Sequence, residues 1–487
     1  MQRLVANLVR GFIPPVVITS VRISLSMSCH HHGMATIGSD NSIDLSNIAA
    51  FHEPEFLFIN KLFQKHGFEV RVAGGAVRDI LMQLNPKDID LATTATPSQM
   101  VEMFTKEQLR MLNRNGESHG TVTIRLNDKV NYEITTLRID LNPDGRHSDV
   151  TFTTDWQLDA SRRDLTVNSM FIGVEFDDLE ADSHGAAPSA SIRGKLYDYF
   201  NGFEDLSHRR IRFVGDPKAR IQEDYLRILR YFRFHARLSN SPDDHDEATL
   251  KAITETSSGL WGIAGERIWI ELKQIFCYPS VPLLLRYMAK TGVTQACGLP
   301  ASPNYAELEK VFERGLLRHD PNPVTCVAAA LHSTDEVDTL FDRIRPSNLE
   351  SNIVYFLVEW REHLASTDAL EFLKREYLLS MDQARLKPVF DEAMRYFGDA
   401  AGEALASWLA WQAPRFPVNG TLVSERWGIK GRLLRSLLQG LRTAWVDSGC
   451  SLTADELLSS EMHQKLASAQ PDDLQRSPLI PLKRQRR

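Results

Sequence analysis

Hydrophobic and polar positions follow two different patterns along the chain, and the change falls near Tyr199. Residues 51–66 carry apolar side chains at helical spacing, whereas apolar and polar residues alternate within 122–126 and 132–134. Alternation with a period of two predicts strands with one buried face, and Asn127–Asp128 predicts a turn between them. After Tyr199 the pattern is helical. Strands followed by helices predict an α+β head and an all-α remainder.

A pair of glycines separates the predicted strand Val70–Ala73 from the start of a helix. Gly75 lets the backbone approach a phosphate closely, and Arg78 can add a charged, bidentate contact. This motif therefore indicates a phosphate site, although a tight turn from strand to helix also explains the glycines.

Two carboxylates, Asp88 and Asp90, begin ten residues after Arg78. In a strand they point to the same face, because side-chain direction repeats every two residues. They repel each other unless a cation neutralises them, and magnesium prefers a few carboxylates together with substrate phosphates. Glu133, on the strand predicted at 131–138, can bring a third carboxylate to that face; an exposed strand acid is the alternative. The pattern predicts a magnesium site for nucleotide transfer.

Composition excludes several classes of protein. The five cysteines are scattered without a CxxC pair, which argues against a zinc site and a disulfide framework. No uninterrupted apolar run reaches the roughly 18 to 20 residues of a membrane-spanning helix, so we expect no membrane contact. The net charge of −7 argues against nucleic-acid binding, but the segment Arg209–Arg237 has nine basic and three acidic residues. Local charge decides phosphate affinity, so this segment can bind nucleic acid.

The two ends of the chain have their own compositions. Residues 1–38 contain arginines and serines but no acidic residue, which is typical of a mitochondrial presequence. An N-terminal segment without a targeting role is the alternative, and internal starts at Met27 or Met34 would yield a cytosolic or nuclear form. Residues 471–487 end in a basic cluster, which is a solvated end, a nuclear signal or a phosphate-binding tail.

The segment Arg220–Arg237 is expected to form one amphipathic helix. On a helical wheel its apolar face comprises Tyr225, Ile228, Leu229, Phe232 and Ala236. Its opposite side comprises Arg220, Glu223, Asp224, Arg227, Arg230 and Tyr231. A solvated charged face is the usual reading of such a helix, but this face also places an acceptor beside fixed donors, as recognition of a base edge requires.

Five motifs occur in order: GGAVRD, DIDLATTATP, EITTLR, RRDLTVNSM and RIQEDYLRILRYFRF. Together they resemble the motifs of class II tRNA nucleotidyltransferases, relatives of bacterial poly(A) polymerases. The resemblance covers about residues 50–280 and is weaker beyond. It implies a polymerase-β-like head with a mixed five-stranded sheet, followed by an all-α neck, body and tail. It also implies transfer of C, C and A from CTP and ATP to the 3′ end of tRNA, with Mg²⁺ as cofactor and no nucleic-acid template.

The resemblance implies roles for individual residues. Asp88 and Asp90 would hold two magnesium ions, and Glu133 would help to deprotonate the primer 3′ hydroxyl. Gly75 and Arg78 would contact the triphosphate. Arg163 and Asp164 would contact the nucleotide sugar and phosphates; an exposed ion-pair cluster at a helix start is the alternative for that pair.

The resemblance also implies that protein side chains select the base. Arg227 would donate to O2 and N3 of cytosine or to N1 of adenine, and Asp224 would accept from the exocyclic amine. Uracil and guanine present a ring N–H to the same arginine, so they would be rejected. Arg230 and Arg233 would serve phosphates, although Arg233 lies about 180° from Asp224 on the wheel.

The expected domain organisation follows from the same comparison. It comprises a leader at 1–38, a catalytic head at 45–201, a neck at 202–280, a body at 281–400, a tRNA-binding tail at 401–470 and a basic end at 471–487. We expect a mobile loop at 105–120, a surface insertion at 177–194 and no obligate protein partner. The rival functions are a poly(A) polymerase, which shares the head chemistry, and a non-catalytic tRNA-binding factor, against which the three retained carboxylates argue.

Overall fold

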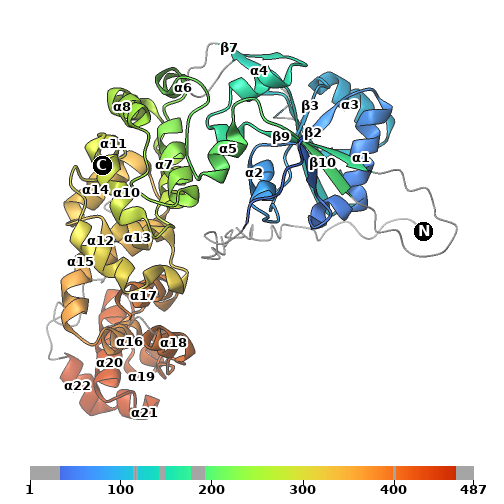
Figure 1. Cartoon of the computed structure of the whole chain (residues 1–487). Helices are drawn as coiled ribbons and strands as arrows, with labels where there is room; N and C mark the ends of the chain where they lie inside the picture. Colours follow the sequence, from blue (N-terminus) through green and yellow to red (C-terminus); the bar gives the residue numbers. More distant parts are fainter. Residues whose placement is uncertain are drawn as a thin grey trace, which may run out of the picture.

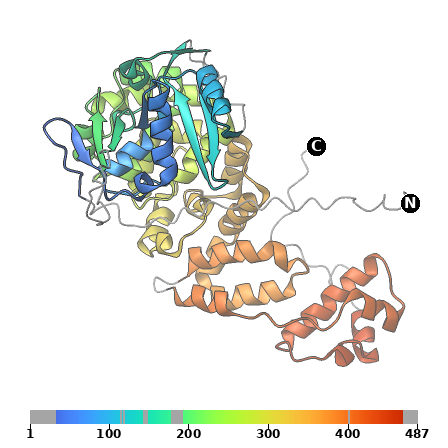
Figure 2. The ribbon, with the colours of Figure 1, turned by 90° about the vertical axis from the view of Figure 1, so that its right-hand side faces the viewer.

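The computed structural model describes residues 33–112, 116, 119–141, 149–176, 192–398 and 402–467. A head built on a β-sheet is followed by a long array of helices, and the last helices lie at the end far from the sheet (Figures 1 and 2). Residues 1–32 of the expected leader, residues 177–191 of the expected insertion and the basic end lie outside the described residues. Within the described part, no helix is long and apolar enough to cross a membrane.

The head contains one large mixed sheet, with strands in the order β1-β10-β9-β2-β3-β6-β5-β4. Strands β3 and β6 are parallel, and the other neighbours are antiparallel. Its strands are β1 (Ser42–Asp44), β2 (Val70–Ala73), β3 (Leu91–Thr93), β4 (Arg110–Leu112), β5 (Thr121–Leu126), β6 (Val130–Thr136), β9 (Phe171–Phe176) and β10 (Ile192–Tyr197). A separate hairpin comprises β7 (Arg138–Leu141) and β8 (Asp149–Phe152).

The mixed sheet is confirmed, but the expected number of five strands is wrong, because the described residues contribute eight. The edge strands β1 and β4 have three residues each, too few for a pattern of alternation to appear. Strand β4 lies inside the segment 105–120, which we expected to be a loop, and it pairs with β5. The expected hairpin of β5 and β6 is confirmed, and both Asn127 and Asp128 have the positive φ angles of a tight turn.

The two faces of the sheet have different coverings. One face packs Val72, Leu91 and Ile134 into the main hydrophobic core, which helices such as α1 (Pro54–Lys65) and α3 (Pro97–Lys106) cover. The other face contributes Ala73 and Ala92 to a small cluster with α4. Beyond the cluster this second face is open at Asp90 and Glu133, which are exposed. The head helices are η1 (Ala49–His52), α1 (Pro54–Lys65), α2 (Gly75–Leu81), α3 (Pro97–Lys106), α4 (Trp156–Ser161) and η3 (Thr166–Asn168).

All named elements after Tyr199 in the described residues are helices, as the pattern predicts. They comprise α5 (Gly202–Ser207), α6 (Pro217–Glu223), α7 (Arg227–Leu238), α8 (Glu247–Thr256), η4 (Ser257–Gly262), α9 (Gly265–Ile275), α10 (Val281–Lys290), α11 (Val293–Ala296), α12 (Tyr305–Glu313), η5 (Leu316–His319), α13 (Pro323–Ala329), α14 (Thr334–Ile344), α15 (Asn348–Ser366), α16 (Ala369–Leu379), α17 (Gln383–Phe397), α18 (Glu403–Ala410), α19 (Gly420–Trp427), α20 (Arg432–Asp447), α21 (Ala454–Leu457) and α22 (Ser460–Ala467).

The prediction of one helix from Arg220 to Arg237 is wrong, because the chain breaks between α6 and α7 at Asp224. Asp224 has extended backbone, and its carboxylate accepts the Leu226 N–H at 3.1 Å. Such a local side-chain to backbone bond competes with the helical one. Tyr231 is also misplaced by the wheel, since it is fully buried and stacks on Phe213 rather than lying on the charged side.

Two hydrophobic cores hold the molecule together. The larger one runs without interruption from the head through α7 and α9 to α17 and α18. The smaller one joins the end of α16 to α19–α22 around Leu441 and Trp445. The head and the neck helices therefore share one core, whereas the last helices have their own.

Candidate active site

Two of the three predicted carboxylates, those of Asp90 and Glu133, lie side by side on one face of the sheet, and Asp88 precedes them in the segment before β3. Asp90 lies just before β3, and its carbonyl accepts the Ala73 N–H at 3.0 Å, so the ladder with β2 continues through Asp90. In the parallel pair of β3 and β6, Leu91 faces Ile134, and one residue earlier the same register sets Asp90 beside Glu133. Because Leu91 and Ile134 are buried, the preceding carboxylates point to the opposite, open face. Asp88 lies two residues before Asp90, outside the strand, and is exposed.

The electrostatics agree with this grouping. Burial raises the pKa of Asp90, and the nearby charges of Glu133 and Asp88 raise it further, while Arg163 acts in the opposite direction. A divalent cation would remove this repulsion, and oxygen ligands of this kind suit magnesium. Among the described residues no group of three or more His, Cys, Asp or Glu lies in a metal-ligating arrangement. The charges of Asp88 and Glu133 thus act on Asp90, and a magnesium ion held by Asp88 and Asp90 stays a prediction.

The glycine turn lies next to these carboxylates, between β2 and α2. Gly74 has φ 64° and ψ −117°, a backbone conformation that residues other than glycine rarely adopt. A Cβ at Gly74 would stand 2.9 Å from Nη1 of Arg163, whereas a Cβ at Gly75 would make only an ordinary contact with Arg78. Gly74 is therefore the position that requires glycine, and it brings the backbone against the guanidinium of Arg163.

Arg78 is an internal residue, 3% exposed. Its Nη1 donates to Oδ1 of Asn168 at 2.6 Å, and its Nε and Nη2 donate to Oδ1 of Asp79 at 3.1 and 3.0 Å. Burial lowers the pKa of Arg78 to about 10, and the Asp79 carboxylate opposes that shift. The side chain thus lies against the glycine turn, and its donors are bound to protein acceptors. A direct contact with the triphosphate remains a prediction.

Arg163 and Asp164 face in different directions. Arg163 lies over the ring of Phe171 and donates through Nε and Nη2 to Oδ2 of Asp159. Asp164 is buried and accepts from Nε of Arg230 at 2.5 Å, which joins the head to α7. Burial raises the pKa of Asp164 and the Arg230 guanidinium lowers it, with a net downward shift. Asp164 therefore carries its charge as a structural ion pair, and its predicted role at the sugar remains untested.

The turn between α6 and α7 carries the two residues expected to select the base. The Oδ2 atom of Asp224 accepts from Nη2 of Arg267 at 2.8 Å, and its Oδ1 atom holds the turn. Arg267 belongs to α9, so this helix fixes the position of the carboxylate. A Cβ at Gly259 would lie 2.1 Å from the ring of Tyr225, so η4 packs directly against the same turn.

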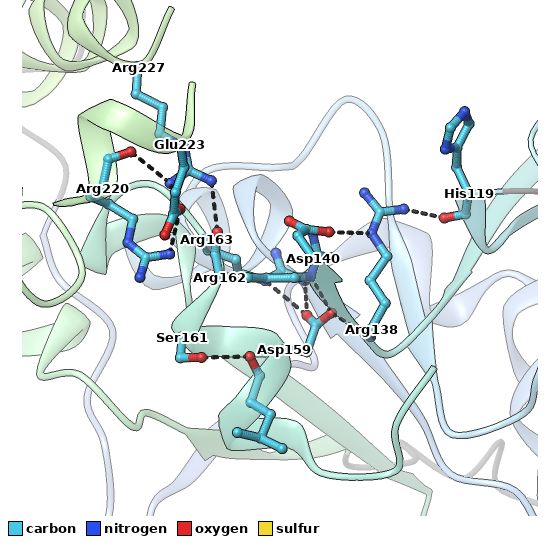
Figure 3. A network of polar contacts seen from close by, with 11 residues as sticks. His119, Arg138, Asp140, Asp159, Ser161, Arg162, Arg163, Arg220, Glu223 and Arg227 are labelled. Carbon is cyan, nitrogen blue, oxygen red and sulfur yellow. Dashed lines mark hydrogen bonds and ion pairs between the residues drawn. The ribbon is translucent and has the colours of Figure 1, made fainter. Parts of the chain in front are cut away.

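Arg227 connects this turn to the catalytic head (Figure 3). Its Nη1 donates to Oε2 of Glu223 at 2.6 Å and to the Arg220 carbonyl at 3.0 Å. Its Nη2 donates to the Arg162 carbonyl at 2.9 Å, across the boundary between neck and head. The Arg227 side chain is 13% exposed, and three acceptors orient its guanidinium. These bonds hold Arg227 beside the residues that line the glycine turn.

The phosphate roles expected for Arg230 and Arg233 find no direct support in the contacts. Arg230 forms the ion pair with Asp164, and Arg233 donates to Glu271 and Gln274 of α9, at 3.3 and 3.1 Å. Both guanidinium groups are thus bound to protein acceptors, and contact with phosphates stays a prediction for each.

Sequence reasoning missed Asp159, which organises this part of the site. Asp159 is 1% exposed. Its carboxylate accepts from Nε of Arg162, from Nε and Nη2 of Arg163 and from the Arg138 N–H. Asp159 lies in α4 and Arg163 lies just beyond its end. Their i,i+4 spacing could have indicated the pair. Figure 3 shows the network continuing through Asp140 and Arg138 to the carbonyl of His119.

The fold and the site define a nucleotidyltransferase with a head of the poly(A) polymerase type. The family described as "Poly A polymerase head domain" matches residues 70–212. The family described as "Probable RNA and SrmB- binding site of polymerase A" matches residues 245–297.

Individual relatives narrow this class. The mitochondrial CCA tRNA nucleotidyltransferases 1 of Mus musculus and Homo sapiens are each 44% identical over 404 residues, which cover 82% of this chain and 88% of each relative. The chain belongs to the CCA tRNA nucleotidyltransferase family. Among solved structures, the Bacillus stearothermophilus CCA-adding enzyme in complex with CTP matches with a TM-score of 0.61 at 24% identity, over 85% of this chain and 98% of that one. The likeness to that structure shows the shared fold.

Proposed function

We propose that this chain adds C, C and A to the 3′ end of tRNA, using CTP and ATP and releasing pyrophosphate. The observation that carries this proposal is the contact of Arg227 with the Arg162 carbonyl, because it joins the turn that we propose to select the base to the part of the head next to Arg163. Relatives named CCA tRNA nucleotidyltransferase support the reaction. A Thermotoga maritima CCA-adding enzyme of the same fold was solved with tRNA_CCA.

Asp88 and Asp90 are proposed to hold Mg²⁺ when nucleotide is present. The cation would supply charge stabilisation for the primer 3′ oxygen and the leaving pyrophosphate. Glu133 stands beside Asp90 in the register of β3 and β6. We propose that its carboxylate accepts the proton of the primer 3′ hydroxyl. The carboxylates then orient the hydroxyl toward the α-phosphate.

The chain's cationic residues are proposed to bind the nucleotide. Gly74 and Gly75 let the triphosphate approach the backbone, and Arg163 lies beside this turn with its charge fixed by Asp159. Arg78 lies against the turn, where its positive charge would offset the charge of the triphosphate. Asp164 holds α7 in place through Arg230. Arg233, which is bound to α9, would reach the phosphates only by exchanging that contact.

Base selection is proposed for Arg227 and Asp224, which would exchange part of their protein contacts for a base edge. The Glu223 carboxylate and the Arg267 guanidinium keep the two side chains in position before nucleotide enters. A preformed donor and acceptor lower the ordering cost of binding and leave a mismatched N–H without a partner.

The names of the vertebrate relatives support a mitochondrial location. We propose that residues 1–38 direct import and that starts at Met27 or Met34 give a second, cytosolic or nuclear form. Import of the full chain into isolated mitochondria, compared with a chain starting at Met34, tests this directly. Equal import of both would contradict a targeting role.

The experiment that tests the reaction offers single nucleotides to tRNA ending at the discriminator base, at C and at CC. We expect two C additions followed by one A, and no addition by the Asp88→Ala/Asp90→Ala variant. Repeated A on any RNA end would indicate a poly(A) polymerase. Binding of tRNA by a folded wild-type protein without any incorporation would indicate a non-catalytic binding factor.

A further inference from the structure

A second contact between head and neck lies at the far end of α7 from the base-selecting turn. Nη2 of Arg237 donates to both oxygens of Asp79, at 2.9 and 3.2 Å. Asp79 lies on α2 of the head, directly after Arg78. The side chain of Asp79 is 19% exposed and that of Arg237 is 29% exposed, so the pair is largely removed from solvent.

Asp79 binds two guanidinium groups at once, one from each side of the boundary. Its Oδ1 atom accepts from Arg78 of the head as well as from Arg237 of the neck. Arg78 also stands 5.0 Å above the ring of Phe234, which belongs to α7. Without the Asp79 carboxylate the buried Arg78 would face Arg237 as an unneutralised like charge, which a buried site tolerates poorly. The carboxylate therefore acts as the link between α2 and α7.

Contacts to the head follow one stripe of α7. Arg227 binds the Arg162 carbonyl, Arg230 binds Asp164, Phe234 packs on Arg78 and Arg237 binds Asp79. The spacing of three, four and three residues keeps these positions on one face of the helix. At 1.5 Å per residue, Arg237 lies about 15 Å along the helix from Arg227. A tilt at the Arg237 end would thus move the selecting turn relative to the carboxylates of the sheet.

We propose that Asp79 and Arg237 are positioning residues that set the angle of α7 against the head, and thereby align the selected nucleotide with Asp88 and Asp90. The inference rests on the proposed function, since it concerns the alignment that nucleotide transfer needs. Both side chains are bound to protein groups, and we assign neither of them a contact with substrate. Small misplacements of reacting groups cost about a hundredfold in rate per ångström, so the alignment acts on kcat.

The test replaces Arg237 rather than Asp79, because Arg237→Gln leaves the internal pair of Arg78 and Asp79 in the head intact. We expect kcat for the first C addition to fall by about tenfold or more, while KM for CTP and for tRNA changes by less than about twofold. Arg237→Lys should restore most of the rate, because Arg237 reaches both oxygens of Asp79 through a single nitrogen. Arg286→Gln, which removes a half-exposed pair with Glu309 within the helical body, is the matched control and should keep wild-type kcat.

The outcomes separate the inference from the proposed function. Wild-type kcat in Arg237→Gln, a rise in KM with unchanged kcat, or an equal loss in Arg286→Gln would overturn the positioning role. A loss that Arg237→Lys does not restore would also overturn it. A wild-type protein that adds neither C nor A would instead contradict the proposed function itself.

Discussion

Gly74 shows how one residue links the fold to the chemistry. Its positive φ lets β2 turn directly into α2, and the missing side chain leaves room for the Arg163 guanidinium. The sequence indicated a glycine turn but could not tell which of the two glycines is constrained, because that depends on Arg163, which is distant in the chain. Similarly, the sequence could not show that Arg78 and Asp164 are bound to other side chains of the protein, and their contact with substrate stays a prediction.

We predict that Gly74→Ala destabilises the protein by about 1 to 3 kcal/mol, because the backbone conformation is strained for alanine and the Cβ crowds Arg163. Displacement of Arg163 should also lower kcat/KM for CTP. Urea denaturation and single-turnover kinetics measure the two effects. For stability alone, Gly75→Ala is the matched control, since its Cβ would make an ordinary contact. Equal free energies of unfolding for the two variants would contradict this account.

The elements of the site combine predictable and unpredictable features. Alternation predicts β5 and β6, and the glycine turn predicts β2 and α2, because these elements carry their pattern in neighbouring residues. Strand β4 and the break at Asp224 do not. A three-residue edge strand shows no period, and a helical wheel does not register the local bond from the Leu226 N–H to Asp224 or the distant Arg267 that fixes the same carboxylate. The helical wheel failed at Tyr231 for the same reason: its burial comes from contacts with distant residues.

A contact between two histidines of the neck leads us to expect that its stability depends on pH. His235 of α7 and His245 stack with ring centroids 3.8 Å apart, and the Tyr231 hydroxyl bonds to Nδ1 of His245. Burial lowers the pKa of both rings, that of His245 to about 3. At His235 the hydrogen bond to the Asp244 carbonyl, and after it the Asp244 carboxylate, opposes the shift in pKa only in part. Both histidines are therefore neutral in the folded protein at neutral pH.

We predict that the neck loses stability as the pH falls below about 6.5, where the unfolded histidines begin to bind protons. The folded pKa values lie below the unfolded ones, so protons favour the unfolded chain throughout the window from about 6.5 down to about 3. Urea denaturation between pH 8 and pH 5 measures this loss. His245→Gln should weaken the pH dependence; an unchanged dependence would mean that other groups cause it.

In the described residues, the head, the neck and the helices as far as α18 share one core, and the last helices, α19–α22, pack with the end of α16 in a separate one. This division explains how direct contacts can align the proposed base-selecting turn with the carboxylates, since the elements that carry both contribute side chains to the larger core. The order of a β-containing head before a helical remainder is readable from the sequence, because the change of period is visible along the chain. The extent of each core is not, since it depends on which helix faces meet.

We predict that Leu441→Ala opens the smaller core without disturbing the head. Leu441 is fully buried in α20, and such a truncation costs about 2 to 5 kcal/mol. Hydrogen exchange should become faster in α19–α22 and stay unchanged in the sheet. Leu433→Ala, on the same helix but 49% exposed, serves as control. Faster exchange in the head as well would show that the two cores unfold as one unit.

Selection of the base by the protein itself is the central claim of this account. Its most direct test is the ratio of kcat/KM for CTP over UTP on tRNA lacking CCA, measured for wild type and Arg227→Ala. Loss of one base contact worth about 1 to 3 kcal/mol should lower this ratio by roughly 5- to 150-fold. If Arg227→Ala slows all four nucleotides equally and leaves the ratio unchanged, Arg227 only holds the neck to the head, and the base is selected elsewhere.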